Sequence, residues 1–350
     1  MSELGQIWEW FAETSCKGYS PLYDRICRVV ARDDAVLALV QEAPPPAHQP
    51  NVLLGVVHYL LLGGLDHPLA AVYAGESDAD PGPLFVDVCL THRAEVLELM
   101  ETRRTQTNEC GRSAVIGPAL TWVAQQYGAP LALLDVGASA GLNLACDRYR
   151  LDYGEHGATG PRNAPVQIAC KVRGGVPPIA PALPEITARL GLDRSPIDLT
   201  DAKDARWMLA CIWPDTGRLE RTSAAIREAQ LRPPTIRTGD MVDDLRAAIN
   251  ELPADALACV TTTWALAYLQ RAGREQFAAQ LGAAGRVRPV VWISGETPGI
   301  VGPLADRKPP PDLDDIEPSL LGAIRYDGDT QDATALAWVH PHGAAIDWIA

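Results

Sequence analysis

The residues whose types and spacing most clearly suggest a ligand site form a glycine-containing turn at 133–141, which reads LLDVGASAG. A buried strand that runs through such a turn into a helix brings backbone N–H groups close to a ligand. Asp135 precedes Gly137 by two residues and places a carboxylate near the mouth of the turn. A carboxylate suits a cationic ligand, such as an ammonium or sulfonium group, better than a pyrophosphate. The dinucleotide pattern G-x-G-x-x-G is not matched either, because Ser139 replaces its second glycine.

A second polar run, residues 101–113, reads ETRRTQTNECGRS and lies between two apolar segments. On a helix Asn108 and Arg112 would share one face. We expect this run to line a ligand cleft, with Arg104 or Arg112 holding a carboxylate and Glu109 available as a base. A solvated helix end followed by a loop is the alternative interpretation.

The elements that must position these residues fall into two parts. Residues 1–128 carry apolar side chains at helical spacing without a clear strand, which predicts a helical region that would act as a lid. Helices are expected there at about 86–109 and 115–127. Over residues 129–350 short apolar runs alternate with helical stretches, which predicts an α/β domain.

That domain is predicted to hold a mostly parallel sheet with antiparallel C-terminal strands. Parallel strands are expected at 131–136, 185–193, 235–238, 257–263 and 290–294, and antiparallel ones at 324–326, 335–340 and 344–349. Helices are expected at 141–149, 206–231 with a break at Trp213-Pro214, 242–252 and 273–281, and a hairpin from 149–153 and 166–172. Ligands of such sheets bind at the carboxyl ends of the strands.

The run 133–141 resembles the first motif of class I S-adenosylmethionine-dependent methyltransferases. Over residues 130–350 this resemblance implies a methyltransferase-like (Rossmann-like) fold that binds S-adenosylmethionine. The whole chain, with TQTNE at 105–109 and GASAGLN at 137–143, also resembles an uncharacterised bacterial family of unknown function with a methyltransferase-like domain.

The resemblance implies which residues would bind the cofactor and the substrate. The methionine part of the cofactor would lie against the turn and the residue after it: Asp135, Gly137, Ala138, Ser139, Gly141 and Asn143. Asp193 would meet the ribose hydroxyls and Asp240 the adenine amino group, with Thr262 at the end of the fourth strand. The substrate would contact Arg104, Asn108 and Trp264, with Glu109 and Arg112 in the catalytic roles. The fourth strand ends without Asn-Pro-Pro-Tyr, which argues against methylation of nucleobase amines.

The function expected from these residues is methyl transfer to a small molecule of unknown identity, and two alternatives stay open. The first is non-catalytic binding of S-adenosylmethionine or a related nucleoside. The second is a serine hydrolase, because Ser139 also satisfies G-x-S-x-G and His340 comes late enough to serve as its base. His340 and His342 lack a third ligand in sequence, so no metal site is expected.

Net charge, cysteine spacing and the length of apolar runs limit the classes of partner and the location expected for this protein. The 350 residues carry a formal net charge of −14, which disfavours binding to nucleic acid or to an anionic membrane surface. The eight cysteines include no Cys-x-x-Cys pair, and no apolar run is long enough to span a bilayer. The N-terminus does not resemble a signal peptide. A cytoplasmic protein with a small-molecule substrate is expected, and the oligomeric state stays open.

Overall fold

The computed structural model describes residues 2–128, 130–310, 313 and 318–350. These residues form two compact units. The first consists of the residues up to 107 together with 200–223, and the second of residues 108–199 and 224–350. The chain therefore enters the second unit at residue 108 and not near residue 128. The difference arises because helix α8 (Ser113–Tyr127) packs against strands of the second unit.

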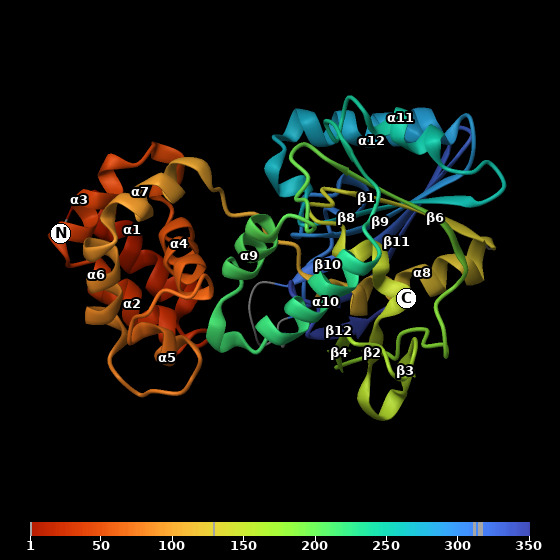
Figure 1. The fold of residues 1–350 in the computed structure, drawn as a ribbon. Helices are drawn as coiled ribbons and strands as arrows, with labels where there is room; N and C mark the ends of the chain where they lie inside the picture. The colour runs from red at the N-terminus through yellow and green to blue at the C-terminus, as the bar shows by residue number, and fades with distance from the viewer. Residues whose placement is uncertain (1, 129, 311–312, 314–317) are drawn as a thin grey trace. The chain divides into compact units, whose positions relative to one another are not determined.

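The first unit is built from helices, as expected for the N-terminal region (Figure 1). Side-chain caps begin several of them: Ser20 accepts from the Tyr23 amide, for example, and Asp33 accepts from the Val36 amide. The helices are α1 (Glu3–Phe11), α2 (Pro21–Val30), α3 (Asp34–Glu42), α4 (Pro50–Leu62), α5 (Leu69–Tyr73), α6 (Pro81–Thr91), α7 (Arg93–Thr102), α9 (Ala202–Ala210) and the start of α10 (Leu219–Leu231).

Residues 200–223 belong to this unit although they are far from it in sequence. Asp215 accepts hydrogen bonds from the Ser20 hydroxyl at 2.6 Å and the Leu22 amide at 2.9 Å. Trp213 packs among aromatic rings of the same unit. The predicted helix break at Trp213-Pro214 is confirmed, since α9 ends before it and α10 begins after it.

The prediction of a single helix over residues 86–109 is wrong. It is two helices, α6 and α7, and residues 103–109 have no regular secondary structure. The break lies at His92, whose φ of −104° and ψ of 31° leave the helical region. Asn108 and Arg112 therefore do not share a helix face.

The second unit is built on a sheet that holds nine strands within the described residues, in the order β7-β6-β1-β8-β9-β10-β11-β12-β5. The five strands from β7 to β9 are parallel, whereas β10, β11 and β12 form an antiparallel series, which confirms the mixed α/β class. The strands are β1 (Leu131–Val136), β5 (Lys171–Val172), β6 (Ile186–Asp193), β7 (Ile236–Thr238), β8 (Leu257–Thr263), β9 (Val290–Glu296), β10 (Ser319–Asp327), β11 (Thr330–Val339) and β12 (Ala345–Trp348).

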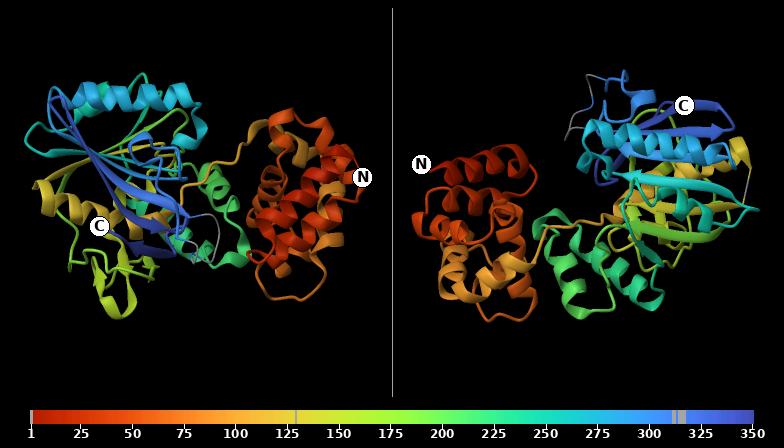
Figure 2. Two further views of the ribbon diagram at one scale, coloured as in Figure 1. Left: turned by 180° about the vertical axis from the view of Figure 1, so that it is seen from behind. Right: turned by 90° about the horizontal axis from the view of Figure 1, so that it is seen from above.

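Helices cover both faces of this sheet (Figures 1 and 2). One face carries α11 (Leu245–Glu251) and α12 (Arg271–Gly285), and the other carries α8. Side chains alternate along a strand, so Leu134 and Val136 enter the core beneath α11 and α12. Asp135 between them points to the opposite face.

Two elements predicted around the glycine turn are wrong. The helix expected at 141–149 is a short 3₁₀ segment, η4 (Leu142–Arg148), because Gly141 is left-handed at φ 73° and Ala145 interrupts the helical dihedrals. The expected hairpin is also absent from the described residues. Instead a small sheet pairs β2 (Arg150–Asp152) antiparallel with β3 (Ala158–Thr159) and parallel with β4 (Gln167–Ala169).

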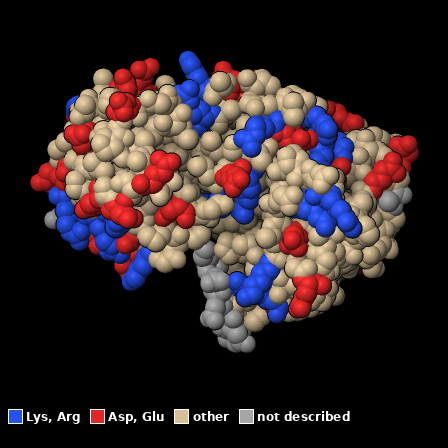
Figure 3. All heavy atoms as spheres, turned by 60° about the horizontal axis from the view of Figure 1, so that its bottom comes forward, with Lys and Arg blue, Asp and Glu red and all other residues tan. Residues whose placement is uncertain are grey.

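Three further features concern the surface charge, the cysteines and the helix lengths. On the face drawn in Figure 3, Lys and Arg side chains are interspersed with Asp and Glu. All eight cysteines are buried free thiols. The described part of the chain contains no helix with the length and apolarity needed to cross a bilayer.

The turn between β11 and β12 lies against residues 109–112 and helps to position them. Gly343 in this turn has φ 74°, and a Cβ placed on it would collide with the Gly111 carbonyl. Gly343→Ala should therefore destabilise the protein beyond the roughly 1–2 kcal/mol of a left-handed non-glycine residue. Gly328→Ala is the matched control, since Gly328 has φ 59° and open space around it. Equal shifts of the urea midpoint for the two variants would contradict this close contact.

Candidate functional site

The candidate site lies where the strand order reverses. The chain places β6 on one side of β1 and β8 on the other. Ligands of doubly wound sheets bind at the carboxyl ends of the strands at this position. Here the loops after β1, β8 and β9 meet residues 108–113 and the turn after β11.

Asp135 stands near the end of β1 and is almost completely buried. Its Oδ1 accepts a hydrogen bond from the Thr261 hydroxyl at 2.8 Å, because Asp135 and Thr261 are direct partners across the β1–β8 ladder. Burial raises the pKa of the Asp135 carboxyl to about 6, while the Thr261 hydrogen bond and the Arg112 charge oppose the rise. An ionised carboxylate at this depth is costly unless a cation lies close by.

Arg112 supplies the positive charge of the site. Its Nη1 donates to the Thr263 carbonyl at 2.8 Å and its Nε donates to the Pro341 carbonyl at 3.0 Å. Burial lowers the pKa of Arg112, and the carboxylates of Glu109, Glu296 and Asp135, in that order, raise it.

Glu109 is buried beside Arg112 at the start of the 3₁₀ turn η3 (Cys110–Arg112). Its Oε1 accepts the Gly111 amide at 2.8 Å, and its Oε2 lies 3.8 Å from Nδ1 of His342. The first contact caps η3, and the second links this segment to the turn after β11. Glu109 thus has a structural role in addition to the base role predicted for it.

Glu296 ends β9 and is also buried. Its Oε1 accepts the amides of Ala265 at 3.1 Å and Leu266 at 3.3 Å, which holds the loop after β8. Its Oε2 is buried without a hydrogen bond to any described residue. Burial raises the pKa of Glu296 to about 7, against the effect of those two amides, of the nearby Thr262 hydroxyl and of Arg112.

The site therefore contains three buried carboxyl groups, on Asp135, Glu109 and Glu296, around one guanidinium. Burial is the largest cause of the raised pKa values of Asp135 and Glu296, so each carboxyl group is costly to ionise in this environment. Within the residues that the structure describes, no group of acids, histidines and cysteines could hold a metal ion. A ligand that brings a positive charge would relieve the imbalance.

The glycine turn directs its own amides inward. Gly137 N donates to the Leu192 carbonyl at 2.8 Å, and Gly141 N to the Ala138 carbonyl at 2.7 Å. A Cβ on Gly137 would lie 2.7 Å from that of Ala265, so packing alone requires a glycine there. These amides do not form a phosphate cradle in this conformation.

Residues 108–113 are tied to the end of that turn. Asn108 Oδ1 accepts the Leu142 amide at 2.7 Å, and the Ser113 hydroxyl donates to Asn143 Oδ1 at 2.9 Å. The structure thus brings Asn108, predicted to bind substrate, together with Asn143, predicted to bind the cofactor.

Ser139 adopts φ 53°, an unusual value for a residue other than glycine. Its amide donates to Asp193 Oδ2 at 2.7 Å, and its hydroxyl is buried without a hydrogen bond to a described residue. His340, the base of the alternative hydrolase, accepts the His342 amide on its Nδ1 at 3.0 Å. A Ser–His pair is therefore not assembled among the described residues.

Trp264 follows β8 and has φ 58°, which costs about 1–3 kcal/mol for a bulky residue. Its backbone amide donates to the Gly295 carbonyl at 3.1 Å, and its indole N–H donates to the Ser319 hydroxyl at 2.7 Å. These bonds hold the ring at the carboxyl end of β8, where its predicted substrate contact stays a prediction.

The remaining predicted residues have structural partners. Asp193 also accepts the Ser195 amide at 2.8 Å, and Asp240 accepts the Val242 amide at 2.8 Å while pairing with Arg194 at 2.5 Å. Bonding to these groups lowers the pKa of Asp240.

Thr262 lies near Glu296, whose pKa its hydroxyl lowers, whereas Arg104 is directed away from the site. Thr262 is fully buried and accepts the indole N–H of Trp292 at 3.0 Å, on the face opposite to Asp135. Arg104 belongs to the first unit, where its guanidinium donates to carbonyls at the end of α7, including that of Met100 at 3.1 Å.

The predicted site residues do not include three contributors: Thr261, Glu296 and His342. Thr261 carries no local signal because its role depends on the register between β1 and β8. Glu296 follows the strand predicted at 290–294, which places it near the expected cleft, but helix capping explains it equally well. His342 was considered only as a metal ligand.

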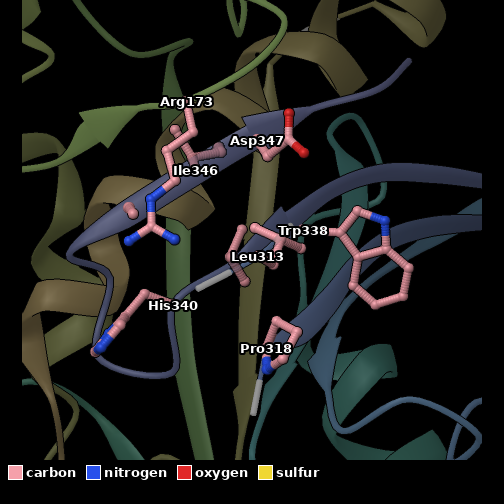
Figure 4. A pocket seen from close by; sticks show the side chains of 9 residues that line it. Arg173, Leu313, Pro318, Trp338, His340, Ile346 and Asp347 are labelled. Atoms are coloured by element: carbon pink, nitrogen blue, oxygen red, sulfur yellow. The ribbon is translucent and has the colours of Figure 1, made fainter. Parts of the chain in front are cut away.

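A small pocket lies beside the turn between β11 and β12. Figure 4 shows Arg173 and His340 on one side of it and Trp338 on the other. Its volume of about 10 Å³ accommodates about one water molecule. This pocket is therefore too small to hold a substrate.

Comparison with known proteins gives one match. The model of a family described as "Uncharacterized protein conserved in bacteria (DUF2332)" covers residues 6–348. Neither the curated proteins nor the solved structures contain a match to this chain.

Glu296 should make stability fall as the pH rises. Between its usual pKa of 4.5 and its folded value of about 7, the folded protein keeps a proton that the unfolded chain has lost. Glu296→Gln removes this ionisation and should reduce the loss of unfolding free energy between pH 5 and 8 by up to roughly 3 kcal/mol. Urea unfolding across this range measures it, with the exposed Glu275→Gln as control. Parallel pH curves for Glu296→Gln and wild type would refute the assignment.

Ser139 should be unreactive as a nucleophile. Because no described histidine bonds its hydroxyl, a fluorophosphonate probe is expected to leave the wild-type protein unlabelled. Mass spectrometry of intact protein measures this, with Ser139→Ala as the background. Stoichiometric labelling that disappears in Ser139→Ala would instead favour the hydrolase.

Proposed function

The chain belongs to the bacterial family whose model spans it, and we propose that it binds S-adenosylmethionine and transfers the methyl group to a small molecule. The observation that carries this proposal is the buried Asp135 carboxyl group beside the glycine turn, where the strand order reverses. The family description names no activity, so the argument rests on this site.

Charge supports a cationic ligand. Asp135, Glu109 and Glu296 outnumber the single guanidinium of Arg112 in a buried region. S-adenosylmethionine carries both a sulfonium and an ammonium group, either of which would stabilise the ionised acids. A phosphate-bearing ligand would meet carboxylates and inward-directed amides, and so fits less well.

The sheet supports the same ligand class. Its parallel strands follow the order 3-2-1-4-5 when numbered along the chain, which is the doubly wound arrangement with its ligand crevice beside β1. An antiparallel strand, β10, closes the parallel series, as the class I methyltransferase resemblance implies. Here β10 and β11 form an adjacent antiparallel pair.

The residues of the site can be assigned roles in the transfer. When bound, the sulfonium supplies an electrophilic methyl group and departs as a neutral thioether. Asp135 would hold the cationic part of the ligand. Arg112, which is fixed by its hydrogen bonds to two carbonyls, would offset the charge of the acids. Glu296, with a pKa of about 7, is suited to accept the proton that the acceptor loses near neutral pH. Trp264 would exclude water from the acceptor side.

Non-catalytic binding is the second candidate, and one observation favours it. Glu109 and Glu296 each use one carboxylate oxygen to accept backbone amides, so structural roles account for part of their burial. Binding and transfer must therefore be measured separately.

Binding of S-adenosylmethionine should release protons at pH 6.5. A cation beside Asp135 lowers the pKa of a carboxyl group that titrates at about 6, so the bound protein gives up a fraction of a proton. Calorimetry in two buffers of different ionisation enthalpy measures this release. S-adenosylhomocysteine, which lacks the sulfonium charge, should release less.

Asp135→Asn should weaken S-adenosylmethionine about ten- to hundredfold and affect S-adenosylhomocysteine less. Asp243→Asn, an exposed acid outside the site, is the matched control. Folded wild-type protein that gives no heat with either ligand would overturn the proposal. Binding without transfer of a labelled methyl group to a metabolite extract would select the non-catalytic candidate.

A further inference from the structure

A cavity of about 170 Å³ lies beside the glycine turn, among η4, β6 and the loop that enters β7. Its walls combine apolar and neutral residues with three arginines, Arg148, Arg189 and Arg232. An apolar cavity of roughly 150 Å³ can hold a benzene-sized molecule, so this one has room for a compact ligand group. All of its lining residues belong to the second unit.

The three arginines of the cavity wall form ion pairs with two acids that do not line it. Arg232 and Arg148 approach the same oxygen of Glu228, Oε1, at 3.1 Å and 3.9 Å. Arg189 contacts Asp147 at 2.6 Å. The Nε–H of Arg189 is buried without a hydrogen-bond partner among the described residues. Two carboxylate oxygens of the cluster, Asp147 Oδ1 and Glu228 Oε1, are also buried without a hydrogen bond to a described residue, so an anion would have to lie on the arginine side and away from them.

The charges of this cluster do not cancel. Three guanidinium groups face two carboxylates, which leaves one positive charge in a chain whose formal net charge is −14. Guanidinium groups present their donors as a planar fork that matches carboxylate and phosphate oxygens. We propose that this cavity binds the oxyanion group, phosphate or carboxylate, of a small metabolite.

The walls indicate how such a ligand would enter. The side chain of Arg232 is 62% exposed, whereas those of Arg148 and Arg189 are 29% and 25% exposed. The oxyanion would therefore lie against the two inner arginines, with Arg232 closing the outer side. Any larger part of the ligand would extend toward solvent past Arg232.

The cavity also adjoins the methyl-transfer site. Pro234 in its wall packs on Gly141, where a Cβ would lie 2.8 Å from the proline Cγ. A molecule bound in the cavity would thus contact the end of the glycine turn. The anion site does not require methyl transfer, and its test uses no S-adenosylmethionine.

Calorimetric titration of the full-length protein with inorganic phosphate and, separately, with malonate tests the site. Wild type should bind at least one of them, and the stronger ligand identifies phosphate or carboxylate as the preferred group. Arg232→Gln should weaken that binding at least about tenfold, because it removes a charged donor. Its exposure makes loss of folding an unlikely confounder, and circular dichroism checks this.

Arg271→Gln is the control for net charge. Arg271 is 92% exposed on α12 and pairs with Glu275 alone among the described residues, so this variant changes the total charge equally without touching the cavity. Its anion affinity should equal that of wild type. The proposal is overturned if neither anion binds wild type at millimolar concentration, or if the two variants weaken binding equally.

Discussion

The guanidinium of Arg112 is the contact on which the candidate site depends. It donates to the carbonyl that ends β8 and to that of Pro341, which is 229 residues away in sequence. One partly buried cation thus joins the segment before α8, the parallel core and the antiparallel C-terminal strands. A buried guanidinium cannot lose its proton at ordinary pH, so its charge must be balanced where it lies. Asp135, Glu109 and Glu296 provide that balance and exceed it.

The excess of acid explains several otherwise separate features. Asp135 and Glu296 have raised pKa values, because burial disfavours each ionised carboxylate more than its hydrogen bonds and the Arg112 charge favour it. Each acid also accepts a local donor: the Thr261 hydroxyl for Asp135, and backbone amides for Glu109 and Glu296. These donors hold the carboxylates in fixed positions while leaving the charge imbalance unresolved. This excess of fixed carboxyl groups is the feature on which the proposal of a cationic ligand rests.

The sequence predicts the parallel core well because each of its strands is a local apolar run. The run at 257–263 is β8, and that at 131–136 is β1. Local patterns were misleading where long-range contacts decide, as at 103–109, where a helical pattern gave way to irregular chain. The site residues also differ in whether a local pattern or a long-range contact reveals them. Asp135 was found from its place before a glycine, whereas Thr261 became meaningful only through pairing of β1 with β8.

The glycines of the turn are weaker evidence for a ligand than the pattern suggests. Gly137 has to be small because Ala265 packs on it, and Gly141 because Pro234 does. Packing therefore accounts for both residues without any ligand. Asp135 is different, because a Leu or Val at the same place would fill the space without the cost of burying a carboxyl group. Its hydrogen bond to Thr261 reduces that cost but does not remove it, as the raised pKa of the carboxyl group shows. The argument for a cationic ligand thus rests on the acid that precedes the turn, and the glycines contribute only the shape that lets a ligand approach it.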